Sequence, residues 1–208
     1  MTRTLTFTRT HMLNNLTRRT FLAASGGALV AGPVWALTEA QARTLVDGLV
    51  AEINRVIGSG KSEAAMIGDF KNIFAKYGDV PIMAQYALGV DGRSASAAQK
   101  RQFGDVFAGY ISRKYGKRFR EFIGGRIEVK SARQIKAGYE IKTTAYLRGE
   151  APFEVTFLVS DKSGRNLFYN MFIEGVNLLL TERTEIGSLL DRNGGNIDKM
   201  IADLARMG

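Results

Sequence analysis

The sequence predicts an α+β fold with a single curved antiparallel sheet of about four strands, an N-terminal helical layer packed on one face, and two short C-terminal helices. Three observations support this prediction. Apolar residues recur every three or four positions up to residue 122, which is typical of helices. Between residues 127 and 173 they alternate with polar residues, and short turns join the alternating segments, so consecutive strands should pair antiparallel. A helical period returns after residue 178, and this segregation of helices from strands indicates α+β.

Residues 1–36 have the features of a twin-arginine-type signal peptide, so we expect the folded domain to comprise residues 37–208. Arg18 and Arg19 precede an uncharged stretch that ends in Val34-Trp35-Ala36, where cleavage is expected after Ala36. The apolar part is too short to cross a bilayer as a permanent anchor. A buried N-terminal helix is the alternative, but the order of charge followed by apolar residues favours export.

Two capping boxes mark helix starts in the helical layer. Thr38 with Gln41, and Ser96 with Gln99, place a hydroxyl and an amide where they can satisfy free backbone amides. The second box starts the longest helix, in which Gly116 is a weak point. The expected helices cover 38–57, 62–77, a short segment from Pro81, and 96–122.

The strand patterns lead to a chain reversal near residue 175. The last strand is apolar on both faces, so it is covered on both sides or borders a cavity. Glu174-Gly175 should end it, and Asn177 can cap the helix that follows. One face of this strand should carry Leu167, Tyr169, Met171 and Ile173. The expected strands cover 127–130, 139–147, 153–160 and 167–173.

Two short helices should complete the chain, with apolar stripes at Leu189 and Leu190 and at Ile197, Met200, Ile201 and Leu204. Glu182 and Glu185 precede these stripes at three-residue spacing. Paired carboxylates can serve hydrolysis, but an exposed helix face beside Arg183 is the simpler interpretation.

The charge balance excludes few partners. The full chain of 208 residues has a net charge of +9, and removal of residues 1–36 takes away four arginines and no acid, which leaves +5. This surplus can favour anionic partners such as phospholipid headgroups, although a soluble surface with a mild excess of lysine explains it equally well. No polybasic block of the kind used for nucleic acid is present, so no nucleic-acid partner is expected.

Missing residue types restrict the chemistry further. The chain has no cysteine, and its single histidine, His11, lies in the export segment. Histidine- or cysteine-based nucleophilic catalysis and the usual zinc sites are therefore excluded. No phosphate-binding loop is present. We expect no catalytic residues, no metal and no cofactor; an enzyme could use only tyrosines and carboxylates.

The most informative feature is an excess of apolar residues over a plain two-layer core. Methionine and aromatic residues fill irregular gaps, and they can equally line a tunnel for flexible acyl chains. Ordinary core is the simpler interpretation from composition alone. A tunnel wall should lack charged side chains, because an unpaired charge against acyl chains is costly. The candidates are Leu147, Phe153, Val155, Phe157, Met171 and Ile173 on the sheet, and Phe74, Met83, Tyr86, Phe107, Tyr110 and Phe119 on the helices.

Several of these features occur together in one family. The pair Phe168-Tyr169, the sequence Glu174-Gly175-Val176, the terminal Gly195-Asn196-Ile197-Asp198, and an aromatic helix ending in Tyr115-Gly116 follow in order across residues 38–207. This order resembles the MlaC-type periplasmic phospholipid-binding proteins, also known as the toluene-tolerance auxiliary transport family. Asn170 and Asn177 stand where that family often has Asp and Ser.

The resemblance implies a lipid carrier. Proteins of this kind hold phospholipid tails between the sheet and the helices, and the apolar candidates together with Val176, expected at the pocket mouth, become the tail-binding wall. The implied role is a monomer in the periplasm of a Gram-negative bacterium, with bound phospholipid as its ligand. It would shuttle lipid between an inner-membrane MCE-domain ABC transporter complex and an outer-membrane lipoprotein complex.

Three alternatives remain open at this point. The carrier could hold another apolar ligand, such as a hopanoid-like molecule. The chain could instead be a Tyr/carboxylate enzyme on a similar cone-shaped α+β scaffold, which requires a buried Asp or Glu beside a Tyr hydroxyl in the pocket. A ligand-free interaction module would have no cavity between sheet and helices.

Overall fold

The computed structural model describes residues 37–208, apart from the side chains of Phe119 and Arg120. The predicted signal peptide lies outside the described residues. Both capping boxes are confirmed, because Thr38 and Ser96 each accept the backbone N–H three residues on. The helices are α1 (Glu39–Ile57), α2 (Glu63–Tyr77), α3 (Val80–Leu88), α4 (Ala97–Gly116), α5 (Leu178–Arg192) and α6 (Ile197–Leu204), with 3-10 turns η1 (Gly89–Arg93) and η2 (Lys117–Arg120).

The predicted α+β class is confirmed, and the sheet is an antiparallel meander in the order β1-β2-β3-β4-β5. It has one short strand more than expected. Glu174 and Gly175 both have positive φ, 50° and 79°, which is the geometry of a two-residue hairpin turn. This turn brings Val176 back against Ile173, and Asn177 then caps α5. The strands are β1 (Arg126–Ile135), β2 (Gly138–Tyr146), β3 (Phe153–Ser160), β4 (Leu167–Ile173) and β5 (Val176–Asn177).

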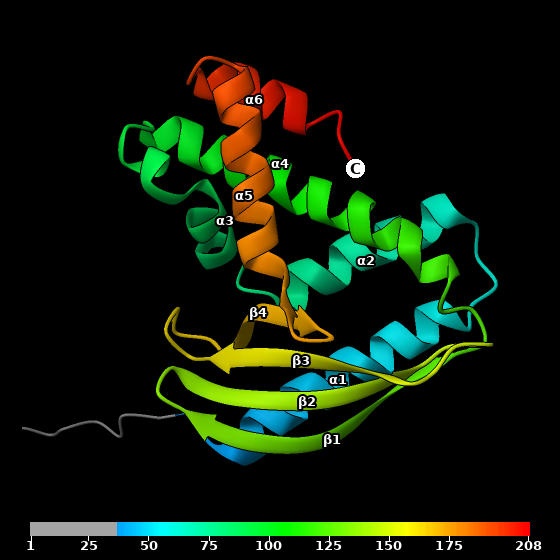
Figure 1. The fold of residues 1–208 in the computed structure, drawn as a ribbon. Coiled ribbons are helices and arrows are strands. Elements are labelled where there is room, and N and C mark those ends of the chain that lie inside the picture. The colour runs from blue at the N-terminus through cyan, green and yellow to red at the C-terminus, as the bar shows by residue number, and fades with distance from the viewer. Residues whose placement is uncertain (1–36) are drawn as a thin grey trace, which may run out of the picture. The chain divides into compact units, whose positions relative to one another are not determined.

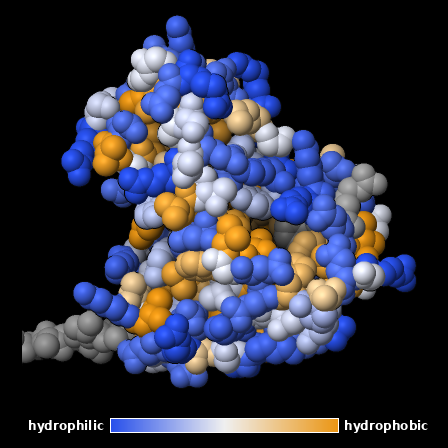
Figure 2. All heavy atoms as spheres, in the orientation of Figure 1, coloured by the Kyte–Doolittle hydropathy of each residue, from blue (hydrophilic) through white to orange (hydrophobic). Residues whose placement is uncertain are grey.

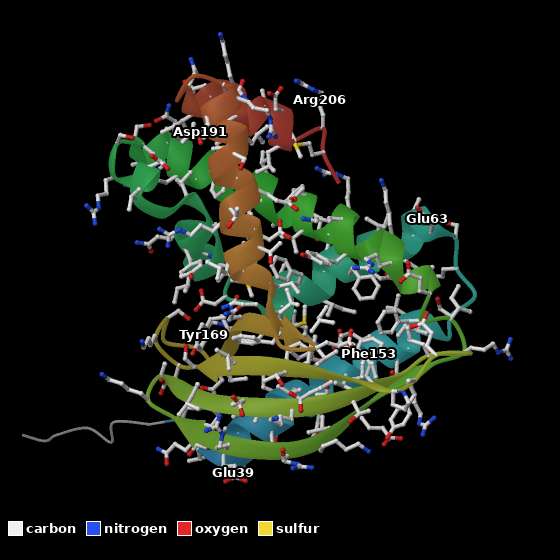
Figure 3. The ribbon with its side chains drawn as sticks, in the orientation of Figure 1. Glu39, Glu63, Phe153, Tyr169, Asp191 and Arg206 are labelled. Carbon is white, nitrogen blue, oxygen red and sulfur yellow. The ribbon has the colours of Figure 1, made fainter. Side chains whose placement is uncertain are left out.

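The helices lie in two groups relative to the sheet. Helix α1 runs across β1, β2 and β3, whereas α3 and α5 contact β4, and α2 packs against α4 (Figure 1). The side chain of Asn54 fixes α1 to the sheet, because it both donates to and accepts from the backbone of Ile127, at 3.1 and 3.0 Å. Side chains of both layers reach into the space between them (Figure 3).

Helix α4 ends earlier than the sequence pattern suggests. The aromatic stripe continues to Phe122, but the α-helix stops at Gly116 and passes into η2. A Cβ at Gly116 would lie 3.0 Å from Cγ1 of Ile67, so glycine allows α2 and α4 to approach closely at this point. The chain can then turn down toward β1.

A β-bulge changes the face assignment in β4. Leu158 pairs with Asn170 but Val159 pairs with Phe168, so Tyr169 is the extra residue. The prediction that Leu167 and Tyr169 share a face with Met171 is therefore wrong, and Phe168 takes that face instead. Its ring packs against Phe157 at a centroid distance of 5.6 Å and against Phe74 at 6.0 Å.

Candidate ligand-binding cavity

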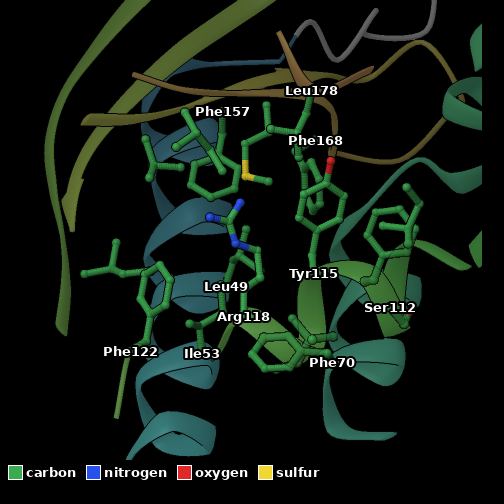
Figure 4. Close-up of a pocket in the computed structure, with 18 of the residues that line it drawn as sticks. Leu49, Ile53, Phe70, Ser112, Tyr115, Arg118, Phe122, Phe157, Phe168 and Leu178 are labelled. Atoms are coloured by element: carbon green, nitrogen blue, oxygen red, sulfur yellow. The ribbon is translucent and has the colours of Figure 1, made fainter. Parts of the chain in front are cut away.

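A cavity of about 490 Å³ lies between the sheet and the helices. Its size falls within the range of about 300–1,000 Å³ found for small-molecule sites. Figure 2 shows apolar residues gathered where the surface is hollowed between the sheet and α4 and α5, and Figure 4 shows the aromatic side chains inside. The wall is predominantly apolar, so it suits a hydrocarbon ligand rather than a sugar or a nucleotide.

Most of the predicted wall residues lie together around this cavity. They come from α2, α3 and α4 on one side and from β3, β4 and the β2–β3 turn on the other. Because β3 and β4 are paired in register, Val155 lies beside Ile173 and Phe157 beside Met171 on the same face. The residues that line the cavity as predicted are Phe74, Met83, Phe107, Leu147, Phe153, Val155, Phe157, Met171 and Ile173.

Three predicted residues lie away from the cavity wall, and the side chain of Phe119 is outside the described part of the chain. Tyr86 is 40% exposed on α3, beneath the guanidinium of Arg183. Val176 is 58% exposed, because the hairpin turn directs β5 to the surface. Tyr110 is buried, but its hydroxyl donates to Glu185 on α5 at 2.7 Å.

The sequence prediction missed part of the wall. Strict alternation places Phe168 on the face of β4 opposite Met171, so the prediction did not include it. The β-bulge at Tyr169 places Phe168 on the cavity face instead. Most of the other missed positions belong to predicted helical stripes that are indistinguishable from ordinary core, so periodicity alone carries no signal for them. They include Leu49, Ile53, Phe70, Ile73, Tyr115 and Phe122.

Charged residues also line the cavity, which contradicts the expectation of an uncharged wall. Arg118 and Glu121 follow α4, Glu150 lies in the β2–β3 turn, and Glu174 lies in the β4–β5 turn. All four are in loops or at the end of a helical segment, where the cavity meets solvent. These charges therefore form its rim, while the interior is apolar apart from Glu182 and the buried polar side chains of Ser112 and Asn170.

Among the described residues of the cavity wall, Glu182 is the one strongly buried carboxylate. The prediction that Glu182 lies on an exposed helix face is therefore wrong. It is 1% exposed on α5. Its Oε1 accepts hydrogen bonds from Tyr115 Oη and from Lys114 Nζ, the latter at 2.8 Å. Lys114 also donates to Glu185 Oε2 at 2.7 Å, so one lysine on α4 holds two carboxylates on α5.

Burial keeps the two phenols of this cluster protonated. Burial, and secondarily the hydrogen bond to Glu182, raises the pKa of Tyr115 far above its ordinary value of 10.0. Burial and the bond to Glu185 do the same to the pKa of Tyr110. Both phenols therefore remain protonated near neutral pH and act as hydrogen-bond donors, while the ion pair joins α4 to α5 beside the cavity.

The described residues contain no group of three or more His, Cys, Asp or Glu side chains placed to hold a metal ion. Within that same part of the chain, no helix combines the length and the apolar character needed to cross a membrane.

The fold is similar to that of a solved structure. A solved structure of a phospholipid-binding protein from Ralstonia solanacearum, in complex with a phospholipid, has a TM-score of 0.64 and 20% identity, and the alignment covers 82% of this chain and 99% of that one. No curated protein sequence matches. The MlaC protein family matches residues 28–206. The chain therefore belongs to the MlaC family.

Proposed function

We propose that this protein is a periplasmic carrier that binds the acyl chains of a phospholipid in the cavity between sheet and helices. It moves lipid between an inner-membrane MCE-domain ABC transporter complex and an outer-membrane lipoprotein complex. The apolar cavity carries this proposal. Family membership and the phospholipid bound by the Ralstonia relative support the choice of ligand.

Burial of an acyl chain supplies enough free energy for such a carrier. Transfer of a methylene from water to an apolar environment is worth about 0.8 kcal/mol. A bilayer offers the chain the same transfer, so the carrier competes with the membrane only if its wall is comparably apolar. The aromatic and aliphatic interior meets this condition, and the charged rim leaves the headgroup next to water.

The surroundings of Glu182 argue against the enzyme alternative. Glu182 lies beside Tyr115, which is the arrangement that such an enzyme requires. However, the carboxylate is already paired with Lys114, and the raised pKa of Tyr115 makes its phenol a poor acid and a poor nucleophile. Family membership likewise favours a binding and transport protein over an enzyme.

Export accounts for the proposed location. The twin-arginine pattern in residues 1–36 directs the chain across the inner membrane, and residues 37–208 form the lipid-binding domain. The absence of cysteine does not conflict with an oxidising compartment, because the fold needs no disulfide there.

Two neighbouring residues on β4 provide the test. Ile173 lines the cavity, whereas Phe172 is half-buried on the other face of the same strand. Ile173→Glu should lose the bound lipid, because an unpaired carboxylate is costly in an apolar cavity. Phe172→Glu is the control that should keep it. Mass spectrometry of organic extracts from the purified proteins measures the lipid.

A second variant guards against misfolding. Ile173→Trp fills the cavity without adding a charge, so it should also lower the lipid content. Lipid-free wild-type protein would contradict the carrier function. A full lipid load in both Ile173 variants would show that the ligand lies elsewhere.

A further inference from the structure

We propose that the cavity rim selects phospholipids with a zwitterionic headgroup, with the lipid phosphate at Arg118 and its ammonium at Glu121 and Glu150. This inference rests on the proposed function and specifies the class of headgroup that the carrier takes.

Arg118 and Glu121 place opposite charges side by side at the rim. Arg118 Nε lies 3.7 Å from Glu121 Oε2, and the two side chains are 66% and 55% exposed. At that separation the pair is an ion pair without a short hydrogen bond, so both groups keep bonding capacity for a ligand. Figure 4 shows the guanidinium of Arg118 reaching into the cavity.

Glu150 lines the same cavity from the β2–β3 turn. Phe122, next to Glu121, packs edge-on against Phe153 at a ring-centroid distance of 6.1 Å. This contact fixes the segment after η2 against the start of β3, just after the turn that carries Glu150. Glu150 is exposed, and none of the described side chains forms an ion pair with it. The described rim therefore carries carboxylates from two segments and one guanidinium, which Glu121 approaches.

The chemistry of the rim matches a headgroup that carries both charges. A guanidinium presents several N–H donors in a plane and binds phosphate oxygens well. In phosphatidylethanolamine the ammonium lies two carbons beyond the phosphate, within reach of carboxylates beside that arginine. Arg118 is the only basic side chain among the described residues lining the cavity, whereas Glu174 adds a further acid. The described part of the rim therefore offers more acidic than basic side chains to a headgroup.

Headgroup competition tests the inference with the mature protein. The protein is incubated at low salt with vesicles of equimolar phosphatidylethanolamine and phosphatidylglycerol with identical acyl chains, and the captured lipids are quantified by mass spectrometry. We expect phosphatidylethanolamine to exceed phosphatidylglycerol by about fivefold, the upper range for one exposed ion pair. Raising the salt to about 0.5 M should reduce this ratio without reducing the total lipid captured, because salt screens exposed charges.

Variants assign the effect to the named residues. The double variant Glu121→Gln, Glu150→Gln should bring the ratio close to one, whereas Asp47→Asn, a 53% exposed acid in an ion pair on α1, should leave it unchanged. Arg118→Gln should weaken capture of phospholipid relative to diacylglycerol with the same chains. Arg133→Gln is the matched control, because Arg133 is 68% exposed and pairs with Glu140 on the sheet.

The outcomes separate this inference from the function on which it rests. Failure of the wild-type protein to capture any lipid contradicts the carrier function. Lipid capture with equal amounts of the two headgroups, or a ratio unchanged in the Glu121 and Glu150 double variant, overturns the headgroup selection alone.

Discussion

The chain contains two clusters of the same three residue types in different surroundings. Lys114, Glu182 and Tyr115 form one beside the cavity, where the side chains of Lys114 and Glu182 are 27% and 1% exposed. Lys76, Glu52 and Tyr77 form the other, where Lys76 and Glu52 are 59% and 20% exposed. Replacing each lysine with methionine removes the cation while keeping most of the side-chain volume.

The expected cost differs because of burial. Removing one partner from a buried ion pair typically costs about 3–5 kcal/mol, since the remaining charge is left without compensation. Because Lys114 is partly exposed, we expect Lys114→Met to lower the free energy of unfolding by a smaller amount, about 2–3 kcal/mol. For a domain of this size the corresponding loss in melting temperature is about 5–10 °C. Lys76→Met leaves a more accessible carboxylate, which water can solvate, so its loss should be at most about a third as large.

Thermal and urea denaturation of the two variants measure this difference. The double variant Lys114→Met, Glu182→Leu provides the decisive control. It also removes the buried carboxylate, and the remaining Glu185 is 46% exposed and can be solvated by water, so most of the lost stability should return. If Lys114→Met lowers the melting temperature no more than Lys76→Met does, the buried ion pair does not hold α5 against α4. If the double variant is less stable than Lys114→Met, the loss comes from packing rather than from an unpaired charge.

Two further predictions follow from the same geometry. Burial raises the pKa of Glu185, but the hydrogen bonds from Lys114 and Tyr110 outweigh burial and lower this pKa below its usual 4.5. The stability that these bonds contribute is therefore present above about pH 4.5 and is lost as the pH falls through the lowered pKa. The melting-temperature difference between wild type and Glu185→Gln should therefore shrink on acidification from pH 7 to about pH 3, and a constant difference would contradict the assignment. Val176→Glu should change the free energy of unfolding by less than about 0.5 kcal/mol and leave the lipid load unchanged, because Val176 is exposed and off the cavity wall; loss of lipid on extraction would place it at the mouth after all.

Features set by neighbouring residues could be predicted from the sequence. A capping box needs only a hydroxyl and an amide three positions apart, so Thr38 and Ser96 identified their helix starts. Gly175 marked the chain reversal for the same reason, since few other residues adopt its backbone angles. The order of helices and strands then determined the α+β class.

Features set by tertiary contacts could not be predicted in this way. The bulge at Tyr169 depends on how β4 pairs with β3, and strict alternation therefore assigned Phe168 to the wrong face. Glu182 follows the pattern of a solvated helix face, and only its contacts with Lys114 and Tyr115 on another helix explain its burial. In both cases the deciding neighbour is distant in sequence.

The distinction between core and cavity is a question of spacing rather than of residue type. An interior packs its side chains closely, so two layers stay apart only where something holds them. Here Phe122 contacts Phe153 at the rim, Phe168 lies between Phe74 and Phe157, and the Lys114–Glu182 pair joins α5 to α4.

Empty apolar space costs about 24 cal/mol per Å³. A fully enclosed, unrelaxed cavity of about 490 Å³ would therefore cost about 12 kcal/mol, comparable with the whole stability of a domain. Opening of the cavity to solvent lowers that cost, and a bound acyl chain removes most of what is left. Ligand binding should therefore increase the free energy of unfolding.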